Sequence, residues 1–111
     1  MVSETDIVNA FGKMADAKKA LFVSGERELA TKEALKKAEA AVLLKYADNP
    51  KDLGGNEPAR NARIRELTAA ERADADKAEK EKRECQLDFD LANLALDCLK
   101  WQIRISMKVE E

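Results

Sequence analysis

The sequence contains no histidine, and cysteine (two), proline (two), glycine (four) and aromatic residues (three Phe, one Trp, one Tyr) are scarce among its 111 residues. Without histidine, no cysteine or serine can belong to the usual histidine-assisted nucleophilic pair. Two separated cysteines also cannot build a structural zinc site. The sequence therefore predicts a protein that is not an enzyme and that carries no cofactor and no metal.

The scarcity of glycine and proline leaves few positions for turns. Apolar residues make up 45% and charged residues 38% of the chain. A composition of this kind is typical of long helices rather than of sheets. At this length we expect a single domain, 1–111.

The two cysteines are predicted to be reduced thiols. Cys85 and Cys98 lie on one predicted helix, about 20 Å apart at 1.5 Å per residue, so they cannot pair with each other. We expect Cys98 in the core, with an intermolecular disulfide at Cys85 as the alternative. No secretory signal and no apolar run of about 20 residues is present. The expected location is therefore the cytoplasm, without membrane contact.

Positive charge is not concentrated in either half of the sequence. The formal net charge is −2, with 9 basic and 9 acidic residues up to residue 55 and 11 basic and 13 acidic residues after it. Proteins that bind nucleic acid regardless of sequence depend on a basic stripe or patch. The charge balance therefore argues against nucleic acid as the partner.

The first predicted helix runs from about residue 4 to 47 and begins at a capping box formed by Ser3 and Asp6. Two seams repeat along it every seven residues. The large seam holds Ile7, Met14, Leu21, Leu35 and Val42, and the small seam holds Ala10, Ala17, Ser24, Thr31 and Ala38. Small seam residues let a partner backbone come close, which favours a tight antiparallel pair. Gly25 predicts a kink or short break beside Ser24.

Turn-forming residues gather in 48–56, which is the predicted main loop. Asn56 is expected to cap a short helix over 57–66. Thr68 and Glu71 form a second capping-box pattern, so a third helix is predicted over 69–107. In the alternative, the second and third helices are continuous.

The C-terminal half of the third predicted helix carries two apolar stripes. The first has coiled-coil spacing and is predicted to pack on the first helix; it consists of Leu87, Leu91, Leu94, Cys98, Trp101 and Ile105. The second is the candidate oligomer interface, with packing against the first helix as its alternative; it consists of Phe89, Leu96, Leu99 and Ile103. Residues 101–109 also alternate between apolar and polar side chains, so a strand is the alternative to helix there.

Together these patterns predict an all-α fold, a long antiparallel helical hairpin with a short connecting helix. The connecting helix holds the only local basic cluster, Arg60, Arg63 and Arg65. This cluster is a candidate contact for an acidic partner or an anion. The alternative is that its arginines pair with nearby carboxylates such as Glu57 and Glu66.

One stretch of the sequence resembles a known group of proteins. It comprises Leu53-Gly54-Gly55-Asn56-Glu57, Arg60-Asn61-Ala62-Arg63, and Leu67-Thr68 with Glu71. This stretch is similar to one that joins two long helices in small helical, coiled-coil-like proteins encoded by tailed bacteriophages and prophages. The resemblance covers about residues 42–105. It implies a phage gene product made inside a bacterial host, from a family without a settled activity and with no functional residues to carry over.

The function expected from these observations is that of a non-enzymatic phage or prophage interaction protein. We expect it to form a homo-oligomer, a dimer or larger, and to bind or inhibit a host factor. The first alternative is a protein that sequesters a small ligand or nucleotide through its arginine cluster. The second is an accessory to phage recombination or DNA handling, which predicts salt-sensitive DNA binding.

Overall fold

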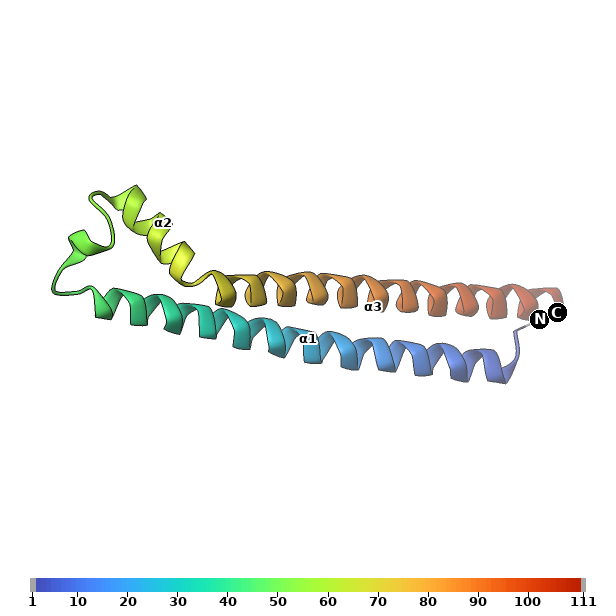
Figure 1. Cartoon of the computed structure of the whole chain (residues 1–111). Helices are drawn as coiled ribbons and strands as arrows, with labels where there is room; N and C mark the ends of the chain where they lie inside the picture. The colour runs from blue at the N-terminus through green and yellow to red at the C-terminus, as the bar shows by residue number, and fades with distance from the viewer. Residues whose placement is uncertain (1, 111) are drawn as a thin grey trace. The chain divides into compact units, whose positions relative to one another are not determined.

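The protein is an all-α helical hairpin, as expected, and its computed structural model describes residues 2–110, with side chains described for 2–108. Its elements are α1 (Glu4–Lys45), the short 3-10 helix η1 (Pro50–Asp52), α2 (Glu57–Leu67) and α3 (Ala69–Glu110) (Figure 1). α1 and α3 run antiparallel, and α2 lies in the connection between them. Within residues 2–110 there is no strand, so the strand alternative for 101–109 is wrong.

The chain forms two compact units. The first contains α1 up to Ser24 and α3 from Glu81 onward. The second, Gly25–Lys80, contains the rest of α1, η1, α2 and the beginning of α3. Each unit therefore pairs one part of α1 with one part of α3.

The start of α1 is fixed by the predicted capping box. The Ser3 amide donates to Asp6 Oδ2 at 2.9 Å, and the Asp6 amide donates to Ser3 Oγ at 3.1 Å. These two bonds lower the pKa of Asp6 from its usual 3.8, and the bond from the Ser3 backbone has the larger effect. Two backbone donors that α1 itself leaves unpaired are satisfied in this way.

The burial pattern along α1 follows the two predicted seams. Every large-seam and small-seam residue is at least half-buried, whereas most of the positions between them are exposed. The hydroxyl groups in the small seam bond back to their own helix, because Ser24 Oγ donates to the Leu21 carbonyl at 2.9 Å and Thr31 Oγ1 to the Glu28 carbonyl at 3.0 Å. α1 continues through Gly25 without interruption, so the expected break does not occur.

The connection in the second unit is held by a cap and a buried leucine. Asn56 caps α2 as predicted, because its Oδ1 accepts from the Ala59 amide at 2.9 Å. Leu53 is only 7% exposed and anchors the loop before it. Ile64 is half-buried on α2, whereas Leu67 is exposed.

Thr68 separates α2 from α3 by a different bond from the one predicted. Its hydroxyl donates back to the Ile64 carbonyl at 2.7 Å rather than pairing with Glu71 in a capping box. Its backbone (φ −111°, ψ 22°) departs from helical geometry, so the alternative of one continuous helix is wrong. The residue is almost fully buried, and bonding to its own helix satisfies the hydroxyl where water cannot reach it.

The core at the start of α3 is built from alanine. Ala75 and Ala78 are 5% and 2% exposed, and their small side chains allow the helices of the second unit to lie close together. At the edge of this contact, Arg72 Nη2 donates to Glu39 Oε1 on α1 at 3.1 Å. The first half of α3, which is rich in charged residues, therefore has one buried face.

Gly54 generates the first test, because α2 passes close to it. A Cβ at residue 54 would lie 2.8 Å from both the Ala59 carbonyl carbon and the Arg60 amide nitrogen, which are backbone atoms that cannot rotate away. We expect Gly54→Ala to lower the free energy of unfolding by about 1–3 kcal/mol, measured by urea unfolding. Gly55→Ala is the matched control, since nothing lies within 4 Å of its added Cβ. Equal losses in the two variants would contradict the close approach.

Candidate interaction surface

The stripe predicted as an oligomer interface lies inside the hairpin instead. We call Phe89, Leu96, Leu99 and Ile103 the inner stripe. Leu96 is only 4% exposed, and the other three are half-buried in the first unit, where α1 is the other helix. The alternative reading, packing against the first helix, accounts for this burial. The prediction that the inner stripe forms the oligomer interface is therefore wrong, because Leu96 has almost no surface left for a second chain.

The stripe predicted to pack on α1 faces outward. We call Leu87, Leu91, Leu94, Cys98, Trp101 and Ile105 the outer stripe. The five large side chains in it are between 54% and 62% exposed, and Cys98 is exposed as well. The outer stripe lies about half a turn around α3 from the inner stripe, at 100° per residue. α1 covers only one face of α3. The expectation that Cys98 lies in the core is therefore wrong, because Cys98 is on the exposed face.

The outer stripe is bounded by opposite charges. Glu84 lies three residues before its first leucine, and Lys108 lies three residues after its last isoleucine, both exposed. Glu84 and Lys108 thus each occupy the next position of the coiled-coil spacing, with the acidic residue at the N-terminal end of the stripe and the basic residue at its C-terminal end. Next to the stripe, Gln86 Nε2 donates to Asp90 Oδ1 at 3.0 Å, which holds that carboxylate at the stripe's edge.

Two further contacts hold charged side chains beside the outer stripe. The Arg104 guanidinium carbon lies 5.4 Å from the centroid of the Trp101 ring, a cation–π arrangement. Lys100 Nζ lies 4.0 Å from Asp97 Oδ1. The apolar stripe is therefore flanked by oriented charges of both signs.

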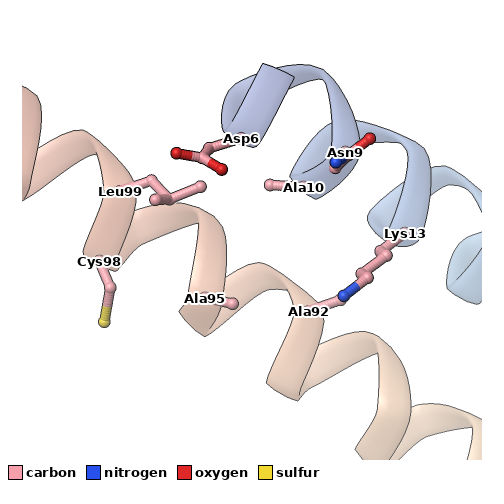
Figure 2. A pocket seen from close by; sticks show the side chains of 8 residues that line it. All are labelled: Asp6, Asn9, Ala10, Lys13, Ala92, Ala95, Cys98 and Leu99. Atoms are coloured by element: carbon pink, nitrogen blue, oxygen red, sulfur yellow. The ribbon is translucent and has the colours of Figure 1, made fainter. Parts of the chain in front are cut away.

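A groove of about 560 Å³ lies beside the outer stripe in the first unit (Figure 2). Asp6, Asn9, Ala10 and Lys13 line it from α1, and Ala92, Ala95, Cys98 and Leu99 line it from α3. Figure 2 shows the Lys13 side chain reaching toward Ala92 and the Cys98 sulfur pointing away from α1.

Small residues of both helices line the groove. Ala10 lines it from α1 and Ala92 and Ala95 line it from α3, and these small side chains do not fill the space between the helices. The Asp6 carboxylate at its rim accepts from the Ser3 amide, and this bond lowers the pKa of the carboxyl below its usual 3.8. The groove therefore offers a hollow with one carboxylate and one ammonium group at its edge.

The arginine cluster on α2 is only partly available for binding. Arg63 Nη1 lies 3.1 Å from Glu66 Oε2, which agrees with the alternative that these arginines pair with nearby carboxylates. Arg60 is half-buried and Arg65 is exposed. Arg65 also lies about 160° around α2 from Arg63, at 100° per residue. The three arginines therefore do not point at one site.

Among the described residues, no group of three or more Cys, Asp or Glu side chains is placed to hold a metal ion. None of the helices in this part of the chain is both long enough and apolar enough to span a bilayer. Cys85 and Cys98 are both free, with Cys85 half-buried. Comparison with protein-family models, curated proteins and solved structures finds no match for the chain.

The opposite exposure of the two stripes generates a second test. We expect Leu96→Ala to lower the free energy of unfolding by about 3 kcal/mol, because it leaves a cavity between α1 and α3. Leu94→Ala is the matched control, two residues away and 59% exposed, and should cost less than about 1 kcal/mol. Both are measured by chemical unfolding at the lowest workable protein concentration. The reverse ranking would mean that the outer stripe is the one that packs on α1.

Proposed function

We propose that this protein is a non-enzymatic interaction protein of the cytoplasm that self-associates through the outer stripe of α3. The observation that carries this proposal is the exposure of six residues with coiled-coil spacing on the face of α3 opposite α1. Burying such a stripe against another helix is favourable, because it removes continuous apolar surface from water. Within the described chain, α1 already occupies the other face of α3.

The chemistry of the described surface supports binding rather than catalysis. The outer stripe offers leucine, isoleucine and tryptophan, flanked by charged side chains that can select a partner's orientation. The charged groups beside the groove are Asp6, which is held by the Ser3 cap, and Lys13. Both features suit an interface with an apolar centre and a polar rim.

Binding or inhibition of a bacterial host protein is the second part of the proposal. It rests on the resemblance of residues 42–105 to small phage proteins. Besides the outer stripe, α1 offers an exposed patch of Ala15, Lys18, Lys19, Phe22 and Val23. Phe22 and Val23 are 69% and 58% exposed, and the two lysines beside them favour an acidic protein surface as the partner.

Self-association is tested by placing a charge in the outer stripe. We expect the wild-type protein to form a dimer at micromolar concentration, measured by sedimentation equilibrium. Leu94→Glu should raise the dimer Kd by more than about a hundredfold, because each dimer loses two buried leucines and gains two unpaired charges. The control is Leu29→Glu on α1, since Leu29 is equally exposed at 59%. A wild-type protein that stays monomeric would refute the proposal, as would dissociation by the control substitution alone.

Host-protein binding is tested by capture from bacterial lysate. Immobilised wild-type protein should retain a defined acidic protein, and Phe22→Glu should lose it, because the new charge repels an acidic surface. Leu94→Glu is the control that separates this contact from self-association. Equal retention by wild type and Phe22→Glu would exclude the α1 patch as the site.

A further inference from the structure

We infer that the second copy of the chain lies antiparallel on the outer stripe, so that Glu84 of each copy meets Lys108 of the other. This inference rests on the proposed self-association and goes further by fixing its direction and register. Its basis is the order of charges along α3, acidic before the stripe and basic after it. A helix with this order is complementary to itself only when the second copy is reversed.

The register follows from centring two reversed stripes on each other. Leu87 then lies opposite Ile105 of the second copy, Leu91 opposite Trp101, and Leu94 opposite Cys98. Each layer combines residues of different size, and the smallest stripe residue, Cys98, faces a leucine rather than another cysteine. In the same register Glu84 and Lys108 form the outermost layers, one at each end. All eight positions keep the spacing of three and four residues.

The flanking residues add a second attractive contact. In an antiparallel pair, the residues just before Leu91, Cys98 and Ile105 of one copy face the same class of residue on the other. Asp90 therefore faces Arg104 of the second copy, and this contact occurs twice. Arg104 is already held over the Trp101 ring at the edge of the stripe. These contacts place opposite charges together on one side of the interface.

One like-charge contact remains at the centre of the pair. Asp97 faces Asp97 of the second copy close to the two-fold axis. Lys100 Nζ, 4.0 Å from Asp97 Oδ1, reduces the repulsion between these two carboxylates. On the opposite side of the axis Ala95 faces its own copy, and its small side chain lets the two helices approach.

A parallel pair would have the opposite balance. In register, it would place Glu84 against Glu84 at one end and Lys108 against Lys108 at the other. Its one favourable flanking contact would join Arg83 to Asp88 of the second copy. In the parallel pair, the repulsion between like charges at both ends outweighs the attraction between Arg83 and Asp88. In the antiparallel pair, opposite charges meet at both ends.

The direction is tested by exchanging the charges at the two ends. Glu84→Lys and Lys108→Glu should each weaken the dimer about tenfold, since each places two like-charge contacts where two attractions stood. The double variant should return the Kd to within about twofold of wild type. The measurement is sedimentation equilibrium at low salt, where exposed charges are least screened. A parallel pair would show no rescue in the double variant, because each end of that pair would still bring two like charges together.

A disulfide experiment gives a second, geometric readout. In a Cys85→Ser background, adding Leu94→Cys should produce rapid cross-linking with oxidised glutathione, because residues 94 and 98 of the two copies share a layer. Cys85→Ser alone should cross-link slowly, since the two copies of Cys98 lie about four residues apart along the pair. Rapid cross-linking of Cys85→Ser alone would overturn the antiparallel direction. A wild-type monomer in the same measurements would overturn the proposed function itself, so the two failures can be told apart.

Discussion

α3 carries apolar side chains on two opposite faces, whereas α1 can cover only one of them. This mismatch determines which apolar residues of α3 are buried and which stay exposed. The inner stripe, with Leu96 at its centre, is buried when the hairpin forms. The outer stripe then stays exposed with its spacing intact. Folding of one chain thereby leaves an exposed apolar surface with the spacing of a coiled-coil seam.

Local features of this fold could be predicted from the sequence because they depend on residues three or four apart. The Ser3–Asp6 box and the Asn56 cap both form as expected. The seams of α1 were also predictable, since residues repeated every seven positions lie along the same side of a helix and face the same partner helix. Thr68 shows the limit of such reasoning. A threonine hydroxyl can cap the next helix or bond back to the previous turn, and its burial in the second unit favours the latter.

The assignment of the two stripes could not be made from their own spacing, because both repeat every seven residues. The deciding signal lies further upstream on α3. In the same heptad positions, the inner stripe continues upstream as Cys85, Lys82, Ala78 and Ala75, so three of these four residues are small. The outer stripe continues as Glu84, Lys80 and Lys77, which are all charged. A helix that pairs with α1 in both units needs small or apolar residues at most positions of its seam. The arginine cluster was likewise ambiguous, since only coordinates reveal that Arg63 contacts Glu66.

The small size of the core also has a consequence for how much folded protein a cell holds. Among the described residues, the deeply buried apolar side chains are two alanines and two leucines, namely Ala75, Ala78, Leu53 and Leu96. A core of this size leaves a single chain with little margin against unfolding. When such a chain self-associates, mass action links folding to abundance. Dilution would then unfold the protein as well as dissociate it, and a rise in expression would itself raise the folded fraction.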